Sequence, residues 1–361
     1  MLVSTSFVGM SIPSSTSKQH SLINIITVDN EGDGDYTSIK DAVNNANPGD
    51  TIEVFSGRYN EYSITIRTKD ITLIGNTHEL GTGNDSGKPI IKAIEEKWVM
   101  LLVEVDNVSV QDFVIEGVSI PNLGHQVVCF KYNQNCVLSN CEVIHNGLGS
   151  CVVVFGESHK IMFNNITNGD DGLRINANNI TVIGNRIYNS KAGIKLMGYN
   201  NNILYNIIRD CSGTGIILWD EAVNNTISNN VIKKCHIGIE IDIWKERKNN
   251  LITFNEIRKN GIGINLFVNG GEEVYIHRNN FINNILQILF TGLSFPFYYR
   301  HRILSENYWS NCFGIFPKIG LGISLIPIGF IPGDFFWIIP LPIPRLIFDW
   351  NPALRPYDIG V

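Results

Sequence analysis

The chain has 361 residues, a formal net charge of −6 at pH 7 and a charged fraction of 17%. Nucleic-acid binding requires clustered Lys and Arg, and the sequence contains no basic run, so we expect no nucleic-acid partner. A solenoid grows along one axis and does not divide into domains at the usual size, so the repeats described below favour one elongated domain over two compact ones.

The first 25 residues are interpreted as the remnant of a signal peptide followed by a leader. Residues 1–17 carry no charge, and an apolar run that ends near Ile12 is followed by a cluster of small residues. This pattern is typical of the end of a secretory signal peptide. It predicts an exported protein, outside the cell or in the cell envelope, with a frayed cytosolic terminus as the alternative.

A short helix is predicted at residues 36–47. Thr37 or Ser38 can accept a hydrogen bond from the first helical turn, and the apolar residues that follow fall on one face. Because an open coil of strands exposes unpaired edges at its ends, we expect this helix to cover the N-terminal end of the coil. The polar, Gly-rich stretch between Gly75 and Val99 is expected to form a protruding loop.

An internal repeat runs from about residue 158 to residue 285 and organises the chain. Each copy places an Asn two residues before an Ile, and successive copies are 21 to 25 residues apart. The marker residues are Asn164, Asn185, Asn206, Asn230, Asn255 and Asn280. Asp112 and Cys141 extend the series upstream, and Asn307 extends it downstream.

A second apolar phrase follows each Asn and begins with Gly, as in GLRI at 172, GIKL at 193 and GIEI at 238. Its apolar residues alternate, which is the two-residue period of a strand with one buried face. Parallel strands need a long connection to return to one sheet, and no part of the repeat is long enough for a helix. The sequence therefore predicts an all-β coil over residues 26–311, with about ten turns of one repeat each.

The recurring Asn residues are interpreted as corner residues and not as ligands. An Asn amide both donates and accepts hydrogen bonds, so stacked copies can form a ladder from turn to turn. Asn also tolerates the left-handed backbone that a tight corner requires.

The seven cysteines form no CxxC pair and no zinc-ligand spacing. Most are expected to be small buried hydrophobic residues inside the coil. Their odd number argues against a complete disulfide framework, although not against export.

This arrangement resembles the single-stranded right-handed parallel β-helix of the pectin-lyase-like superfamily, and in style the NosD-like proteins of archaeal and bacterial envelopes. The resemblance covers residues 26–311 and implies the fold, whereas function varies widely among proteins with this coil. The opening segment GDGDYTSIKDAVNNA is similar to that of pectin methylesterases, but the catalytic motif of the esterases is absent. The GDDG string at Asp170 and Asp171 faintly resembles the paired aspartates of polygalacturonases, whose other motifs are missing.

The likeness to NosD raises the question of copper, which prefers grouped His, Met or Cys ligands. The eight His and five Met residues are dispersed along the chain. We therefore expect no metal and no other cofactor, with Ca²⁺ at clustered carboxylates as the alternative.

The stacked turns predict columns of outward side chains on one flat face. If the residue after each Gly points inward, the next residue points outward, and the copies align from turn to turn. One column is Arg174, Lys195, Ile217, Glu240 and Asn265, and the neighbouring column is Asn176, Met197, Trp219, Asp242 and Phe267.

Carboxylates beside exposed aromatic rings are typical of polysaccharide sites, because the rings offer sugars an apolar platform. The predicted substrate-binding residues are Asp170, Arg174, Lys195, Tyr199, Trp219, Asp220, Glu221 and Trp244. If the protein is an enzyme, Asp171, Glu240 and Asp242 are the candidate catalytic carboxylates. The alternative is that these charges are solvated and only keep the coil soluble.

Residues 312–361 form an apolar tail rich in Pro and Ile. A membrane-spanning helix needs about 20 uninterrupted apolar residues, and prolines interrupt this stretch throughout. We expect extended strands that fold back on the coil, with docking on a membrane surface or a partner protein as the alternative. A similar ending in archaeal secreted proteins implies an archaeal source.

Three functions remain open at this point. The leading hypothesis is an exported, monomeric β-helix protein that binds a polysaccharide or cell-envelope glycan along the outward face. The alternatives are a glycan-cleaving hydrolase or lyase that uses the carboxylates of that face, and a structural or adhesive envelope protein.

Overall fold

The computed structural model describes residues 24–94, 99–118, 124–219, 221–243, 249–268, 274–293, 304–310, 318–328, 339–349, 352–353 and 355–360. Only the backbone is described for residues 243, 268, 290–293, 318–328 and 339–349. The signal-peptide interpretation rests on residues 1–17, which lie outside the described residues.

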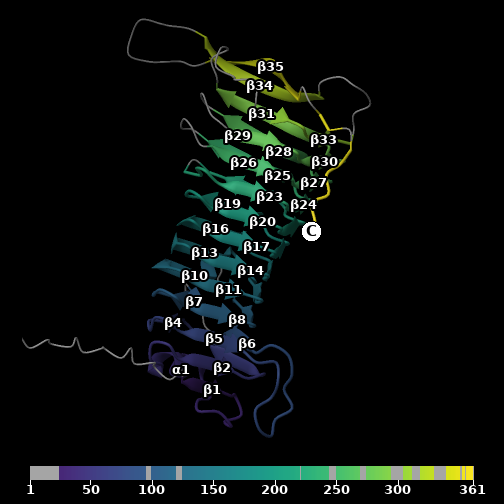
Figure 1. The fold of residues 1–361 in the computed structure, drawn as a ribbon. Helices are drawn as coiled ribbons and strands as arrows, with labels where there is room; N and C mark the ends of the chain where they lie inside the picture. The colour runs from purple at the N-terminus through teal and green to yellow at the C-terminus, as the bar shows by residue number, and fades with distance from the viewer. Residues whose placement is uncertain are drawn as a thin grey trace, which may run out of the picture.

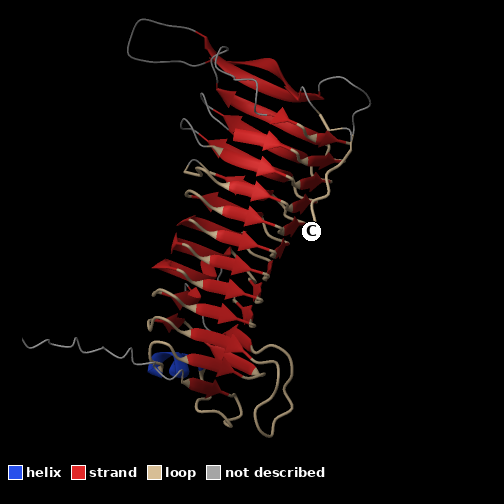
Figure 2. Ribbon diagram, in the orientation of Figure 1, coloured by secondary structure: helices blue, strands red, loops and turns tan. Residues whose placement is uncertain are grey.

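The chain coils around one axis, so that three sheets run along the length of the molecule (Figures 1 and 2). Each complete turn contributes one strand to each sheet, and neighbouring turns pair in parallel register, as β16 (Asp171–Asn178) pairs with β19 (Ala192–Met197). The prediction of an all-β right-handed parallel β-helix is confirmed, and α1 (Ile39–Asn45) is the one helix among the described residues.

Sheet A is 12-stranded and comprises β1 (Ile25–Val28), β2 (Thr51–Val54), β5 (Thr72–Gly75), β8 (Ser109–Gln111), β11 (Val137–Ser139), β14 (Lys160–Met162), β17 (Thr181–Ile183), β20 (Asn202–Leu204), β23 (Thr226–Ser228), β26 (Asn250–Thr253), β29 (Val274–His277) and β32 (Leu304–Ser305). Sheet B is 11-stranded and comprises β3 (Arg58–Glu61), β6 (Ile90–Ala93), β9 (Val114–Glu116), β12 (Glu142–Ile144), β15 (Asn165–Thr167), β18 (Arg186–Tyr188), β21 (Ile207–Arg209), β24 (Val231–Lys233), β27 (Glu256–Arg258), β30 (Asn280–Ile282) and β33 (Tyr308–Trp309). Sheet C is 12-stranded and comprises β4 (Ile64–Ile66), β7 (Val99–Val103), β10 (His125–Gln134), β13 (Gly149–Glu157), β16 (Asp171–Asn178), β19 (Ala192–Met197), β22 (Thr214–Leu218), β25 (Ile237–Ile243), β28 (Ile262–Val268), β31 (Leu286–Leu293), β34 (Lys318–Ile328) and β35 (Ile339–Asp349).

The corner from sheet A to sheet B holds the Asn ladder that the repeat predicts. The Oδ1 of Asn206 accepts the backbone N–H of Asn185, one turn earlier, at 2.9 Å. Its Nδ2 donates to the carbonyl of Val182 at 3.0 Å and to the Oδ1 of Asn230 at 3.0 Å. Because Asn206 is fully buried, the side chain replaces water as the partner of these polar groups.

The prediction that Asn280 belongs to this ladder is wrong. Asn255 donates its backbone N–H to Asn279, and Asn279 donates to Asn307, both at 3.0 Å. The fully buried Phe281 fills the inward position that Ile occupies in the other copies, so the Ile used to align this copy lies one residue too far along. Asn280 instead holds the end of the chain, because its amide exchanges hydrogen bonds with the backbone of Tyr357 at 2.7 and 2.8 Å.

The left-handed backbone of this corner lies one residue before the ladder, not on the Asn as predicted. Phe163 has φ 57°, Tyr205 has φ 54° and Phe254 has φ 54°. Asp112, assigned to the ladder from sequence, has φ 66° and therefore occupies this preceding position as well. Left-handed geometry in such bulky residues is strained, and the buried ladder that follows stabilises it.

Corner length differs among the three sides of the coil. From β14 to β30, two residues separate each sheet A strand from the following sheet B strand. Between β16 and β29, the corners from sheet C to sheet A contain two to seven residues. The changes in repeat spacing therefore arise mainly at this corner.

The interior is filled by stacked aliphatic side chains, such as Ile187, Ile208 and Ile232 in sheet B, all fully buried. Six of the cysteines are also buried and unpaired, as the sequence predicts, and Cys312 lies outside the described residues. Apolar burial contributes about 25 cal/mol per Å² and is the main stabilising contribution in such a coil.

Helix α1 (Ile39–Asn45) lies within the predicted residues, and Ser38 rather than Thr37 caps it, because the Ser38 hydroxyl accepts the N–H of Asp41. Ile39, Ala42 and Val43 are buried against the first turns, and Figure 1 places the helix at that end of the coil. Its role as a cover for the sheet edges stays a prediction.

The tail continues sheet C. Strand β34 pairs in parallel with β31, and β35 returns antiparallel to β34. How the tail packs through its side chains stays a prediction, since residues 312–350 include no described side chain. Among the described residues, the helix that is present is far shorter than the length needed to cross a membrane.

Candidate functional site

The outward face of sheet C carries the predicted column of side chains. Arg174 pairs in register with Lys195, Lys195 with Ile217, Ile217 with Glu240, and Glu240 with Asn265. The residues before and after each member of the column point inward and are buried, as Leu173 and Ile175 are on either side of Arg174. The alignment predicted from the Gly-led phrases is therefore the observed one.

A column of glycines fixes this register. A Cβ on Gly193 would lie 2.5 Å from the carbonyl oxygen of Gly215 and 2.6 Å from Cγ2 of Ile208 in sheet B. A Cβ on Gly215 would meet Gly238 and Ile232 at 2.6 Å each. Each Gly therefore lies where sheets B and C approach closely and a side chain would not fit. The residue after it is buried, and the second residue after it faces outward.

Asp171 lies at the edge of this face and forms ion pairs with two basic side chains. Arg174 Nε donates to its Oδ2 at 2.7 Å, and Lys195 Nζ lies 3.2 Å from its Oδ1. Ser150 Oγ also lies 3.4 Å from Oδ2. Both oxygens of this carboxylate, which is 3% exposed, are thus engaged by neighbouring side chains.

Lys195 joins this ion-pair cluster to an aromatic ring. Its Nζ lies 4.7 Å from the centroid of the Trp219 ring, which is within the range of a cation–π contact. Trp219 follows β22 and is 39% exposed, while Tyr199, at the same side of the coil, is 45% exposed. The backbone N–H of Trp219 donates to the carbonyl of Leu196 at 3.0 Å, which places Trp219 beside Met197 as the second column predicts.

The other predicted residues are distributed along the same face and its rim. Glu240 accepts a hydrogen bond from Thr214 Oγ1 at 3.0 Å, and Asp242 pairs in register with Phe267. Glu221 is exposed in the corner that follows Trp219. Asp220 and Trp244 lie outside the described residues, so their predicted roles stay predictions.

Asp170 lies away from the column, in the corner from sheet B to sheet C. Its Oδ2 accepts the N–H of Gly149 at 3.2 Å. The corner forms a surface depression of about 400 Å³ whose lining includes Asn168, Asp170, Asn189, Lys191, Asp210 and Ser212. The sequence analysis missed Lys191 and Asp210, which the near-constant repeat length brings beside Asp170.

Among the described residues, no three His or Cys side chains bring their ligand atoms together as a three-coordinate copper site requires. The rings of His125 and His145 lie 4.2 Å apart, but His145 accepts the N–H of Gly147 at Nδ1 and contacts the His125 carbonyl through Nε2 at 3.4 Å. Burial raises the pKa of the Cys141 and Cys151 thiols to about 12, which disfavours the thiolate form at neutral pH.

Asp29, Glu31 and Glu79 form a cluster whose carboxylate oxygens lie within 4.8 Å of one another. Among the described residues, it is the one group of three or more His, Cys, Asp or Glu that lies so close together. All of its ligand atoms are carboxylate oxygens, which favour hard cations over copper. The sequence analysis missed this cluster, although acidic residues alternate from Asp29 to Asp35.

A family model described as periplasmic copper-binding protein (NosD) matches residues 105–314, which is more than half of the chain. A search of curated proteins finds no match.

Solved structures share the coil at low sequence identity. The A-module of mannuronan C-5 epimerase AlgE4 from Azotobacter vinelandii is 14% identical, with a TM-score of 0.56 over 70% of this chain and 75% of that chain. The AlgE6 A-module from the same organism is 15% identical, with a TM-score of 0.56 over 70% and 73% of the two chains. Tailspike protein gp49 of Acinetobacter baumannii bacteriophage Fri1, a capsular polysaccharide depolymerase, is 8% identical, with a TM-score of 0.51 over 71% and 53%. These likenesses establish the fold alone.

Proposed function

The chain belongs to the NosD family of proteins described as periplasmic and copper-binding, and we propose that it is an exported β-helix protein that binds a polysaccharide along the outer face of sheet C. The periplasmic description of the family supports an extracytoplasmic location. Copper is not part of the proposal, because the described residues do not supply a grouped set of soft ligands.

The observation that carries the proposal is the ordered row of Asp171, Lys195 and Trp219. The carboxylate holds the ammonium at 3.2 Å, and the ammonium lies 4.7 Å from the indole centroid. A side chain held in one geometry loses little conformational freedom when a ligand binds, so the row is preorganised. An exposed indole offers an apolar platform to a sugar ring, and the flanking polar groups can bind its hydroxyls.

The length and flatness of the face favour a polymer over a small ligand. Arg174, Lys195 and Glu240 occupy one register position on β16, β19 and β25, with Ile217 of β22 between the last two. Polar groups therefore recur along the coil axis at one or two strand spacings of about 4.8 Å each. Three of the structures with the same coil are named for polysaccharide-modifying proteins, which supports this substrate class only by analogy.

A glycan-cleaving enzyme is the second candidate. Asp171 and Glu240 lie on the same face as the aromatic platform, which is the arrangement that this alternative requires. The engagement of both Asp171 oxygens by Arg174, Lys195 and Ser150 weighs against a role in proton transfer. A spacer or adhesive protein is the third candidate, and it requires neither binding nor cleavage on this face.

The test is retention of the full chain on a panel of immobilised neutral and acidic polysaccharides. We expect one glycan to retain the wild type and Trp219→Ala to weaken that binding about tenfold. The matched control is Phe163→Ala, which removes an aromatic ring that is 62% exposed at the corner between sheets A and B. Retention that responds equally to both changes would refute a site on sheet C.

The same incubations separate the alternatives. New reducing or unsaturated ends that disappear in Asp171→Asn or Glu240→Gln would establish an enzyme. Neither retention nor products across the panel would favour the spacer.

A further inference from the structure

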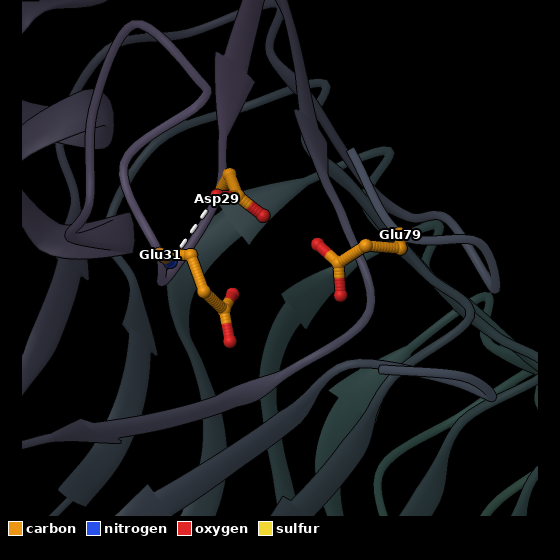
Figure 3. Close-up of side chains that lie close together, drawn as sticks. All are labelled: Asp29, Glu31 and Glu79. Carbon is orange, nitrogen blue, oxygen red and sulfur yellow. Dashed lines mark hydrogen bonds between the residues drawn. The ribbon is translucent and has the colours of Figure 1, made fainter. Parts of the chain in front are cut away.

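Three carboxylates converge at the N-terminal end of the coil, far from the proposed glycan face. Asp29 follows β1, Glu31 lies two residues later, and Glu79 comes from the long loop after β5 (Figure 3). Their ligand oxygens all lie within 4.8 Å of one another. This loop is the excursion between Gly75 and Val99 that the sequence analysis expects to protrude.

The buried carboxylate of Asp29 is only half satisfied. Its Oδ2 accepts the backbone N–H groups of Glu31, Gly32 and Asp33 at 2.9 to 3.1 Å. Its Oδ1 has no hydrogen-bond partner although the side chain is fully buried, and in Figure 3 this oxygen points toward Glu79. A buried carboxylate oxygen without a partner is costly, so a bound ligand is the simplest explanation.

No positive side chain compensates this cluster within the described residues. Asp29, Glu31 and Glu79 take part in none of the ion pairs there, whereas Glu104 and Glu116 nearby on the coil each pair with Lys and Arg. The negative charges therefore repel one another unless a cation lies between them.

We propose that Asp29, Glu31 and Glu79 bind a calcium ion that fastens the loop after β5 to the loop after β1. Ca²⁺ takes six to eight oxygen ligands in flexible geometry, and three carboxylates supplemented by water or backbone carbonyls meet that requirement.

Two features prepare the loops for this role. Glu79 is oriented in advance, because its Oε1 accepts the N–H of Leu80 at 3.0 Å and its Oε2 accepts the N–H of Asp85 at 2.8 Å. The loops are also joined once without metal, since Asp33 Oδ2 accepts the N–H of Thr82 at 3.0 Å. The ion would add a second connection and hold the excursion against the first turns.

The test measures Ca²⁺ binding to the full chain after treatment with EDTA, by isothermal titration calorimetry. We expect one ion per chain with a dissociation constant below about 1 mM. Glu79→Gln and Glu31→Gln should each weaken binding by about tenfold or more, because each removes a charged ligand from the cluster.

Asp85→Asn is the matched control, because it removes the same unit of charge from the same loop without removing a ligand. It should weaken binding less than about threefold. Hydrogen exchange at residues 29–35 and 76–87 should slow when Ca²⁺ is added to the wild type and should not respond in Glu79→Gln. Circular dichroism checks the fold of every variant, and Asp29 is left intact because it holds its own loop.

Two outcomes would overturn the proposal. The first is no saturable Ca²⁺ binding by the folded wild type. The second is equal weakening in Glu79→Gln, Glu31→Gln and Asp85→Asn, which would indicate diffuse attraction to an acidic surface. Neither outcome depends on whether sheet C binds a glycan.

Discussion

Replacing one ladder residue tests whether the Asn column stabilises the coil. In Asn206→Ala, four hydrogen bonds disappear: two accepted by Oδ1 from Asn185, and two donated by Nδ2 to Val182 and Asn230. All of these groups are buried, so water does not replace the lost partner. At about 1 kcal/mol for each net hydrogen bond, the free energy of unfolding should fall by about 4 kcal/mol.

The assay is urea unfolding followed by circular dichroism, combined with hydrogen exchange of the backbone N–H of Asn185. Exchange gives a local measurement, which a solenoid requires because its turns can unfold separately. Asn165→Ala is the control, since the Asn165 amide on the half-buried outer side of sheet B donates only to Glu142 and Tyr188, at 3.3 and 3.1 Å. We expect a loss below about 1 kcal/mol for the control. Equal losses in the two variants, or unchanged exchange at Asn185, would refute the stabilising role of the ladder.

Two further predictions follow from the same geometry. Asn280→Ala should speed hydrogen exchange at residues 355–360, because it frees the backbone of Tyr357. The backbone N–H of Asn255, which donates to Asn279, should keep its protection from exchange, and loss of that protection would contradict the assignment of Asn279 to the ladder. Burial, and secondly the neighbouring His125, lower the pKa of His145 from 6.5 to about 4. The unfolded chain therefore takes up a proton at this residue more readily than the folded chain. Stability is lost as the pH falls from about 6.5 to about 4. His145→Gln should reduce this pH dependence of urea unfolding, whereas the control His78→Gln, at an exposed position, should leave it unchanged.

The arrangement of the sheet C face could be predicted because two sequence features fix it. The apolar residue after the Gly of each phrase is buried, which sets the next residue outward, and equal phrase lengths set which copies stack. Arg174, Lys195 and Glu240 therefore align in the structure as they do in the sequence. A period of two along a strand leaves no other register with the apolar residues inside.

The ladder was harder to assign where one apolar residue replaces another. Phe281 fills the place of Ile, and a rule based on Ile alone moved the marker from Asn279 to Asn280. Left-handed residues such as Phe254 and Arg278 were not predictable, because their side chains carry no preference for that backbone and the packing around the corner imposes it.

Side-chain contacts between polar groups could not be predicted from the sequence either. Strand alternation cannot show that Asp171 turns both oxygens toward Arg174 and Lys195, since those contacts depend on side-chain conformation. The acidic cluster joins Asp29 to Glu79 across 50 residues, and only the coordinates reveal that the two loops meet.

The unequal corners of the coil have a consequence for how such a protein can change its specificity. Between β14 and β30, chain length varies at the junction from sheet C to sheet A, where Tyr199 and Trp219 lie, and stays at two residues at the junction from sheet A to sheet B. Insertions accepted at the variable junction would reshape the rim of the outer face one turn at a time, while the buried asparagines keep neighbouring turns in phase. Diversification of the binding surface is thereby uncoupled from the stability of the scaffold.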